Sequence, residues 1–319
     1  MHSKNRPTDP NRRAVLGGGL AACLTAVLPR AEAAHNRIDR SRISAITDEI
    51  ARDPKGAIDF AKKYRISWLE LRSVPGARKE YFMLPEADLK QAAKEFRDGG
   101  VGISFLNTSM FKYWLPGTEP ARASVKKDPT RFENRAEELK RAANAAHILG
   151  VRKVRVFTFM RTNDPAATMP RIVEHLNELA AMADREKIDL LIENEGACNV
   201  SSAAELAAVV KQVTHRRVGI NWDPLNSAHT KEIAFPDGYE LLPAKRVGNV
   251  QIKGKSILPG PELLDWSGIF KRLEKDGYKG QVGLETHIFG EIQVQKSHES
   301  MQAILQLIEG SHSAPSPSA

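Results

Sequence analysis

Cysteine is scarce in this chain, which has only Cys23 and Cys198 in 319 residues. Cys23 lies in an N-terminal segment with the features of an export signal, so one cysteine is expected after cleavage and an internal disulfide is excluded. Outside that segment no stretch approaches the roughly 20 apolar residues of a membrane-spanning helix. Lysine and arginine are spread along the chain without a basic run, although the formal net charge is +8. We therefore expect neither a membrane span nor a nucleic-acid partner.

Residues 1–33 are typical of a twin-arginine export signal. The pair Arg12-Arg13 precedes the apolar stretch 14–28, and the segment closes on a small–x–small cleavage pattern. We expect a periplasmic or secreted protein that uses the twin-arginine export machinery. The residues up to Cys23 also match a lipoprotein processing site, but the apolar run before them is short. Lipid anchoring at Cys23 is therefore the minor alternative.

Strand-like and helix-like patterns alternate eight times across residues 34–310. This regular alternation implies a parallel sheet, and eight units favour a closed (β/α)₈ TIM barrel over an open doubly wound sheet. No G-x-G-x-x-G motif follows the first strand, which argues against a dinucleotide-binding fold. The strand-like runs are short and rich in Val and Ile, as expected for strands buried on both faces; they are Ile43–Thr47, Trp68–Arg72, Gly102–Asn107, Val154–Phe159, Leu190–Glu193, Val218–Trp222, Val247–Ile252 and Val282–Glu285.

The segments between the strands carry helix signals and two long loops. Residues Thr130–Leu149 have the pattern of an amphipathic helix. The loop Asn107–Lys127 is long enough to be a lid or binding loop, or an excursion that packs its aromatic residues on the barrel rim. The loop Ser227–Pro243 has the same two interpretations. Residues 311–319 are rich in Ser, Pro and Ala and are expected to form a disordered tail. Helix starts are marked by capping residues next to Pro or Ser: Asp53-Pro54, Asp128-Pro129, Asp164-Pro165 and Ser201-Ser202.

The last four predicted strands each end on a polar side chain: Glu193, Asp223, Gln251 and Glu285. In a parallel barrel the strand ends converge on one face, so we expect these residues to form one cluster of oxygen ligands. Three carboxylates and one amide oxygen are a hard ligand set. They predict one divalent metal ion, with Mn²⁺ or Mg²⁺ expected first and Co²⁺ or Zn²⁺ as alternatives.

Such a site suits proton transfer next to a carbonyl. A metal bound to adjacent substrate oxygens polarises the carbonyl and stabilises an enediolate. Glu193 and Glu285 are the candidate pair that removes and returns the proton. Each carboxylate then has to bind the metal through one oxygen only. The sequence therefore predicts an isomerase or epimerase of a sugar, a small keto-sugar or a keto-acid.

Four further residues are candidate substrate-binding groups. Arg155 lies near the end of the fourth strand and could hold a hydroxyl or an anion, or form a salt bridge at the rim. Lys253 and His287 each follow a predicted metal ligand by two residues, so each shares a strand face with that ligand. His229 lies in a loop. For Lys253 the alternative is a structural ion pair.

The chain resembles the xylose isomerase-like barrel superfamily, within the group called sugar phosphate isomerases/epimerases. The resemblance covers about residues 42–308. It implies divalent-metal binding by the four strand-end residues above, with Glu193 and Glu285 exchanging protons. Relatives often form dimers or tetramers, so a homo-oligomer is left open. The motifs that carry the resemblance are Thr-Asp-Glu at 47–49, Leu-Glu-Leu-Arg at 69–72, Val-Arg-Val-Phe at 154–157, Ile-Glu-Asn at 192–194, Asn-Trp-Asp-Pro at 221–224 and Leu-Glu-Thr-His at 284–287.

Two positions depart from the family pattern. The seventh strand usually supplies His in a His-x-Lys pair, and here it supplies Gln251 before Lys253. Hydroxypyruvate isomerases of the same superfamily are similar to this chain in having Gln there, so metal binding is still implied. The other departure is Glu195, where relatives often carry His.

Three other functions compete with the isomerase. A lyase or dehydratase acting on a keto-sugar would use the same acids, and the sequence does not separate the two. A non-catalytic sugar-binding barrel is the second alternative. A DNA-repair endonuclease of the endonuclease IV type is disfavoured, because it needs several strand-end histidines. Export argues for a small-molecule carbohydrate substrate that is not phosphorylated.

Overall fold

The computed structural model describes residues 37–313, and the side chains up to residue 310. The predicted export signal at 1–33, with Arg12-Arg13 and the lipidation candidate Cys23, lies outside the described residues, as do residues 314–319 of the predicted tail. Within the described part, no helix is both long enough and apolar enough to span a membrane.

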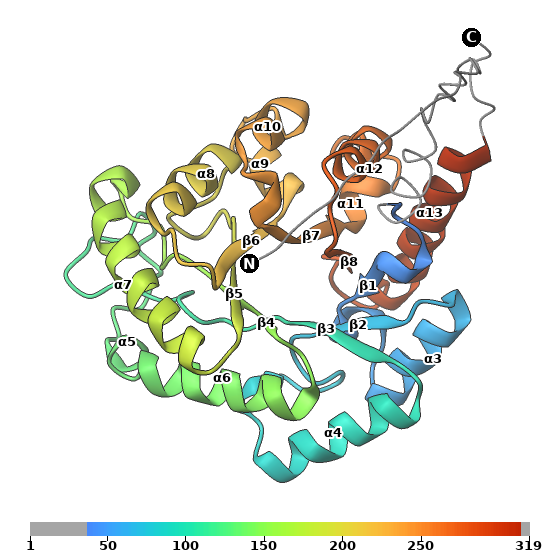
Figure 1. Ribbon diagram of the computed structural model, residues 1–319, viewed down its shortest axis with the longest axis horizontal. Helices are drawn as coiled ribbons and strands as arrows, with labels where there is room; N and C mark the ends of the chain where they lie inside the picture. Colours follow the sequence, from blue (N-terminus) through green and yellow to red (C-terminus); the bar gives the residue numbers. More distant parts are fainter. Residues whose placement is uncertain (1–36, 314–319) are drawn as a thin grey trace, which may run out of the picture. The chain divides into compact units, whose positions relative to one another are not determined.

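Eight parallel strands form one sheet in the order β1-β8-β7-β6-β5-β4-β3-β2 (Figure 1). A parallel bridge between Ile46 and Glu70 joins the two outer strands and brings the sheet close to closure. The predicted TIM barrel is therefore confirmed. The strands are β1 Ile43–Ala45, β2 Trp68–Leu71, β3 Gly102–Leu106, β4 Lys153–Val156, β5 Asp189–Glu193, β6 Val218–Trp222, β7 Val247–Lys253 and β8 Gln281–Glu285.

Helices follow the strands and cover the outside of the sheet (Figure 1). The amphipathic segment predicted as one helix over 130–149 is divided into α5 and α6 at Asn134. The side chain of Asn134 donates to the carbonyl of Thr130 (2.8 Å) and its backbone leaves the helical region. The α-helices are α2 Thr47–Ile50, α3 Pro54–Tyr64, α4 Glu86–Asp98, α5 Thr130–Glu133, α6 Arg135–Leu149, α7 Pro165–Arg185, α8 Ala203–Gln212, α9 Pro224–Ala228, α10 Tyr239–Leu241, α11 Gly254–Ile257, α12 Trp266–Lys275 and α13 Gln293–Ser313.

Three of the four predicted helix-start signals cap their helices, whereas α5 begins after Pro129 without a side-chain cap. Asp53 and Asp164 accept hydrogen bonds from the backbone of the first turns of α3 and α7. Ser202 caps α8, and Glu205 bonds back to the Ser202 backbone, which completes a capping box. These caps fix where each helix begins, and so they fix the length of the loop between each strand end and its helix.

A buried carboxylate, Glu70, lies inside the barrel and accepts four hydrogen bonds from neutral side chains. Its neighbour across the barrel is Gly283, where a Cβ atom would lie 1.9 Å from Glu70 Oε1. A larger residue at this position of β8 would force the Glu70 carboxylate away from its hydrogen-bond donors. The four donors come from strands β1 and β7 and from the residue after β3, at 2.7–3.3 Å: Ser44, Asn107, Asn249 and Gln251.

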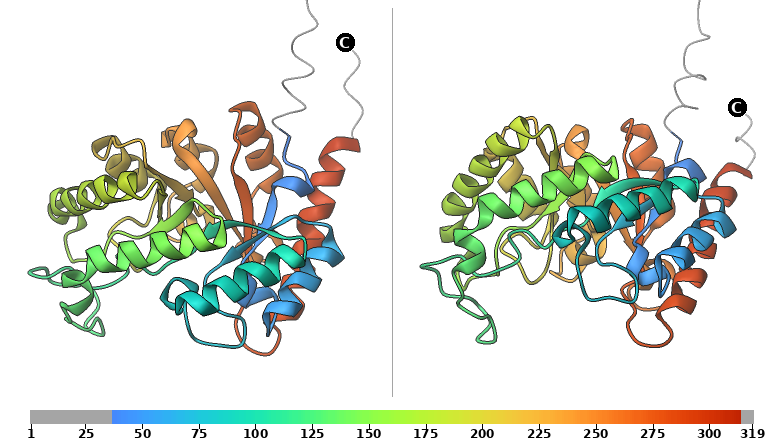
Figure 2. Two further views of the ribbon diagram at one scale, coloured as in Figure 1. Left: turned by 60° about the horizontal axis from the view of Figure 1, so that its bottom comes forward. Right: turned by 90° about the horizontal axis from the view of Figure 1, so that it is seen from below.

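The long loop between β3 and α5 is anchored by its aromatic residues. Phe111 is fully buried and stacks on Phe159 with ring centroids 4.2 Å apart, while Tyr113 meets the same ring edge-on. The first part of the loop therefore packs on the barrel rim. Figure 2 shows loops that follow the strands projecting from one side of the barrel.

Candidate active and metal site

Three of the four predicted metal ligands meet at the carboxyl ends of the strands. Glu193 is the last residue of β5, Glu285 is the last of β8, and Asp223 directly follows β6. Each offers a carboxylate oxygen, and these oxygens lie within 4.8 Å of one another. The three residues are only 0–4% exposed. Buried acids this close repel one another, so each of them needs a positive partner.

Glu193 is held by two donors on one oxygen. Its Oε2 accepts from the Arg155 guanidinium (3.0 Å) and from the amide of Asn221 (2.7 Å). Burial, reinforced by the neighbouring carboxylates, raises the pKa of Glu193 to about 7 although Arg155 opposes the shift. Arg155 is itself buried, and its guanidinium lies over the ring of Phe157. Arg155 is therefore a counter-ion beneath the site.

Asp223 is paired with Lys253. Its Oδ1 caps helix α9 by accepting from the backbone of Asn226, and its Oδ2 lies 2.9 Å from Lys253 Nζ. The same ammonium donates to Asn226 Oδ1 (2.8 Å) and lies 3.7 Å from Glu285 Oε2. Burial raises the pKa of Asp223, and Lys253 offsets part of that rise. For Lys253, burial would lower the pKa, but the surrounding carboxylates outweigh it and raise the pKa.

Glu285 has cations on both oxygens. Its Oε1 accepts from Arg72 (2.9 Å) and lies 3.6 Å from His287 Nδ1, while its Oε2 faces Lys253. Burial would raise the pKa of Glu285, but Lys253, His287 and Arg72 together hold it well below its usual range. Glu193 and Glu285 therefore differ sharply in proton affinity.

Two site residues were missed by the sequence reasoning, although both lie in motifs quoted for the family. Arg72 binds Asp48 (2.9 Å) and Glu49 (2.8 Å) as well as Glu285. Glu49 also accepts the backbone N–H of His287 (2.7 Å), where the backbone has a φ of 50°. Arg72 directly follows β2, so the strand-end rule also finds it, whereas Glu49 lies in helix α2 beyond the end of β1.

Gln251 is oriented by the interior carboxylate. Its Nε2 donates to Glu70 Oε2 (2.8 Å), and its Oε1 is buried without a hydrogen-bond donor. An ionised carboxylate only accepts hydrogen bonds, so the amide has to turn its NH₂ group toward Glu70. The acceptor oxygen is therefore the free end of this side chain.

The donor set fits a divalent cation. Within the site, three buried oxygens accept no well-aligned hydrogen bond: Gln251 Oε1, and Asp223 Oδ2 and Glu285 Oε2, which face the Lys253 ammonium at 2.9 and 3.7 Å. Buried acceptors in proteins are almost always satisfied, and oxygens of these types are the usual ligands of Mg²⁺ and Mn²⁺. The ion-paired network contains five carboxylates and three cations, a formal charge of −2 that one divalent ion balances; its members are Asp48, Glu49, Glu193, Asp223 and Glu285 with Arg72, Arg155 and Lys253.

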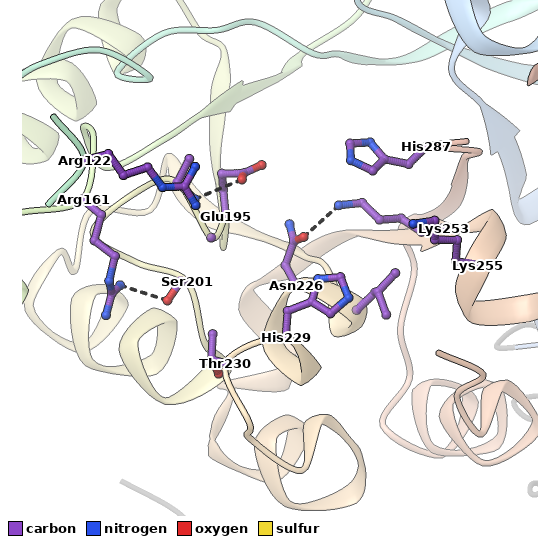
Figure 3. A pocket seen from close by; sticks show the side chains of 13 residues that line it. Arg122, Arg161, Glu195, Ser201, Asn226, His229, Thr230, Lys253, Lys255 and His287 are labelled. Carbon is purple, nitrogen blue, oxygen red and sulfur yellow. Dashed lines mark hydrogen bonds between the residues drawn. The ribbon is translucent and has the colours of Figure 1, made fainter. Parts of the chain in front are cut away.

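A cavity of about 560 Å³ opens at the same end of the barrel. Figure 3 shows Arg122 and Arg161 on one side of it and Lys253, His287 and His229 on the other. Arg122 comes from the long loop after β3, so this loop contributes to the cavity as well as packing on the rim. Three of the predicted substrate-binding residues therefore line the cavity, whereas Arg155 does not.

Two lining residues differ in how firmly they are held. His229 is half exposed, and its Nε2 lies 3.5 Å from Glu262. Glu195 is paired with Lys112 (3.0 Å); burial would raise its pKa, but Lys112, Lys253 and a backbone hydrogen bond together outweigh burial and lower it. At position 195 relatives often carry His. In this chain Glu195 thus places a negative charge, paired with Lys112, on the cavity wall.

Solved structures share this fold at low sequence identity, and no curated protein matches the sequence. The 3-keto-D-glucoside 4-epimerase of E. coli aligns with a TM-score of 0.63 and 14% identity, over 83% of this chain and 98% of that one. D-Psicose 3-epimerase from Clostridium cellulolyticum H10, solved with D-tagatose, gives 0.64 and 15%, over 85% and 98%. The IOLI protein, solved with a zinc atom, gives 0.66 and 16%, over 86% and 100%.

At these identities the structural likeness establishes the fold alone. Sequence comparison reaches further, because the family model described as Xylose isomerase-like TIM barrel matches residues 58–307, most of the chain. The resemblance drawn from the strand-end motifs is thereby confirmed at the level of the family. The chain belongs to the xylose isomerase-like TIM barrel family.

Proposed function

We propose that this protein is a divalent-metal-dependent isomerase or epimerase of a sugar, a small keto-sugar or a keto-acid. The observation that carries the proposal is the buried cluster of Glu193, Asp223 and Glu285, whose ligand oxygens lie within 4.8 Å of one another. The proposal is supported by the fold, which the chain shares with sugar epimerases.

Glu193, Asp223 and Glu285 would hold the metal, with Gln251 Oε1 as a fourth ligand. Hard oxygen ligands favour Mn²⁺ or Mg²⁺, with Co²⁺ or Zn²⁺ as alternatives; the neighbour solved with a zinc atom supports a divalent ion in this fold. When bound, the ion supplies Lewis acidity that polarises a substrate carbonyl and makes the adjacent C–H more acidic.

The two glutamates divide the proton transfer between them. Glu285, whose pKa is held low, is ionised and removes the proton from the carbon next to the carbonyl. Burial raises the pKa of Glu193 to about 7 in the metal-free protein, so Glu193 is the better proton donor of the two and returns the proton. Environments that separate two carboxyl pKa values in this way assign the base and the acid.

An arginine engages one oxygen of each glutamate. Arg155 and Asn221 occupy Glu193 Oε2, and Arg72 occupies Glu285 Oε1. The other oxygen of each carboxylate is left to bind the metal. This arrangement meets the requirement that neither glutamate bind the metal through both oxygens.

The cavity supports a small polar substrate. Its walls carry charged and polar groups from Arg122, Glu195, Asn226, His229 and His287, and its volume of about 560 Å³ suits one or two sugar rings. Hydroxyl and carbonyl oxygens would find donors on both walls (Figure 3).

Hydrogen–deuterium exchange tests the reaction directly. The protein is incubated in D₂O with ketoses, keto-sugars and hydroxypyruvate, with Mn²⁺ or Mg²⁺ and separately with a chelator. We expect deuterium next to a carbonyl only when metal is present. Release of a leaving group without isomerised product would instead indicate the lyase or dehydratase, and ligand binding without exchange would indicate a binding protein.

We also propose that residues 1–33 direct export by the twin-arginine route, so that the protein acts in the periplasm or outside the cell. The support is the order of Arg12-Arg13, apolar run and small residues in the sequence. Replacing both arginines by Lys should retain the protein in the cytoplasm, and unchanged secretion of that variant would contradict the proposal.

A further inference from the structure

Lys253 separates the cavity from the acids of the proposed metal site. The lysine lines the cavity, whereas Glu193, Asp223 and Glu285 are not among the lining residues. Its side chain is nevertheless only 4% exposed, because the ammonium lies against the acids. Figure 3 shows the side chain extending along the cavity wall to Asn226. A molecule in the cavity therefore meets Lys253 before it meets the carboxylates.

The ammonium occupies the position that a cation would take. Nζ lies 2.9 Å from Asp223 Oδ2 and 3.7 Å from Glu285 Oε2. These are two of the three oxygens of the proposed metal site that accept no well-aligned hydrogen bond. A divalent ion bound to them, at roughly 2 Å from each, would leave no room for an ammonium at the present distances.

The other two cations of the site are placed differently. Arg155 and Arg72 each bind the oxygen of their glutamate that does have a donor, Glu193 Oε2 and Glu285 Oε1. Both are also held by further partners, Arg155 by the carbonyl of Thr108 and Arg72 by the acids after β1. They can remain in place beside a metal. Lys253 has a flexible four-carbon stem and lies next to the cavity, so it is the cation that can move.

We propose that Lys253 competes with the divalent metal for Asp223 Oδ2 and Glu285 Oε2, and that metal binding displaces its ammonium into the cavity. The inference rests on the proposed metal site and adds which cation occupies that site before and after the metal binds. In the metal-free protein Lys253 balances the buried acids. In the metal-bound protein the same ammonium faces the substrate, so binding of the ion and presentation of a substrate-binding group are coupled.

Metal affinity tests the competition. The dissociation constant for Mn²⁺ is measured by isothermal titration calorimetry for the wild type, Lys253→Gln and the control Lys255→Gln. Lys255 is two residues away, half exposed at the cavity rim and 4.0 Å from Glu262. We expect Lys253→Gln to bind Mn²⁺ at least about tenfold more tightly, because an internal charge of the same sign is gone. The control, which is screened by solvent, should change by less than about twofold.

A second measurement uses the wild type and does not depend on a folded variant. The full-length protein is treated with acetic anhydride with and without Mn²⁺, and acylation of Lys253 and Lys255 is followed by mass spectrometry. We expect Mn²⁺ to raise the acylation rate of Lys253 several-fold and to leave that of Lys255 unchanged. An unchanged rate at Lys253 in the metal-bound protein would overturn the displacement.

The outcomes separate this inference from the proposed function. Equal or weaker Mn²⁺ binding by folded Lys253→Gln would overturn the competition and leave the metal site intact. Binding by Lys253→Gln but not by the wild type would support the competition in its strongest form. Absence of Mn²⁺, Mg²⁺, Co²⁺ and Zn²⁺ binding in both proteins would overturn the metal site and this inference with it.

Discussion

Two regions of the barrel bury carboxylates, and they satisfy them differently. Inside the barrel, both oxygens of Glu70 accept from neutral donors at 2.7–3.3 Å. At the strand ends, Glu193, Asp223 and Glu285 are paired with cations, and two of them keep an oxygen that accepts no well-aligned hydrogen bond. Full satisfaction by neutral donors suits a structural role. Carboxylate oxygens that face only the ammonium of a flexible side chain suit a site that exchanges one cation for another.

The two regions are joined by amides. Asn249 bonds Glu70 and also Asn221, which in turn donates to Glu193 (2.7 Å). Gln251 bonds Glu70 with its nitrogen and leaves its oxygen free. The interior network therefore orients side chains of the site without contacting substrate, and the comparison can be tested by changing one region at a time.

The largest effect on the reaction is expected at the strand ends. Glu285→Gln should lower metal-dependent deuterium exchange by at least about 100-fold, because the ionised base is lost. Circular dichroism should show a folded barrel. Glu299→Gln on α13 is the matched control, since Glu299 accepts hydrogen bonds from side chains of its own helix and has no place in the proposed site. Exchange at the wild-type rate in Glu285→Gln would remove the proton-transfer role.

The largest effect on stability is expected in the interior. Glu70→Ala leaves the buried donors of Ser44, Asn107 and Gln251 without an acceptor, while Asn249 keeps its bond to Asn221. The free energy of unfolding should fall by roughly 4 kcal/mol, since each orphaned group costs about 1–3 kcal/mol before relaxation. Urea unfolding of the metal-free protein measures the change. Adding metal should not restore it. A midpoint equal to that of the wild type would show that the network contributes little to folding.

Gln251 joins the interior network to the proposed metal site, so a substitution there tests how the two regions are linked. In Gln251→His, one ring N–H can donate to Glu70 and the other nitrogen can face the metal, as in carboxylate–histidine–metal sites. The Mn²⁺ dissociation constant should fall about tenfold. Calorimetry measures it beside the wild type. Weaker binding would mean that residue 251 does not face the ion.

The stability of the metal-free protein should depend on pH in a way that reveals the raised pKa of Glu193. Its pKa is raised from 4.5 to about 7 in the folded state, so the folded protein binds this proton more tightly than the unfolded chain. The resulting stabilisation is present below pH 4.5 and is lost as the pH rises to about 7. Glu285 acts in the opposite sense, because its lowered pKa stabilises the fold above its unfolded value.

The free energy of unfolding is measured for the wild type and for Glu193→Gln, with a chelator present, at the two ends of that pH window. The difference between the two proteins isolates the contribution of Glu193. The stability of the wild type relative to the variant should decline as the pH rises. A constant difference would contradict the raised pKa.

The smallest effect is expected at the cavity rim. His229 is half exposed, and its Nε2 lies 3.5 Å from Glu262 Oε1. His229→Ala should raise KM by less than about fivefold, because exposed pairs contribute at most about 1 kcal/mol. Its Mn²⁺ affinity should match the wild type. A loss of kcat would assign His229 a part in the chemistry.

The fold and the proposed metal ligands could be predicted from the pattern of apolar and polar residues in the sequence. Short apolar runs alternating with amphipathic segments predict a parallel barrel, and the ends of parallel strands converge. Glu193, Asp223 and Glu285 could therefore be grouped although they are far apart in the chain. The break at Asn134 was not predicted, because a side-chain hydrogen bond to the backbone competes with the helix locally.

The sequence by itself determined the family, the eight strand–helix units and the acids at their ends, because these depend on periodicity and residue type along the chain. Only the tertiary structure decided which cation meets which acid. The pairing of Arg72 with Glu285, the orientation of Gln251 by Glu70 and the position of Lys253 over Asp223 join strands that are distant in sequence. Such contacts depend on the closing of the barrel and on side-chain reach, and no spacing in the sequence encodes them.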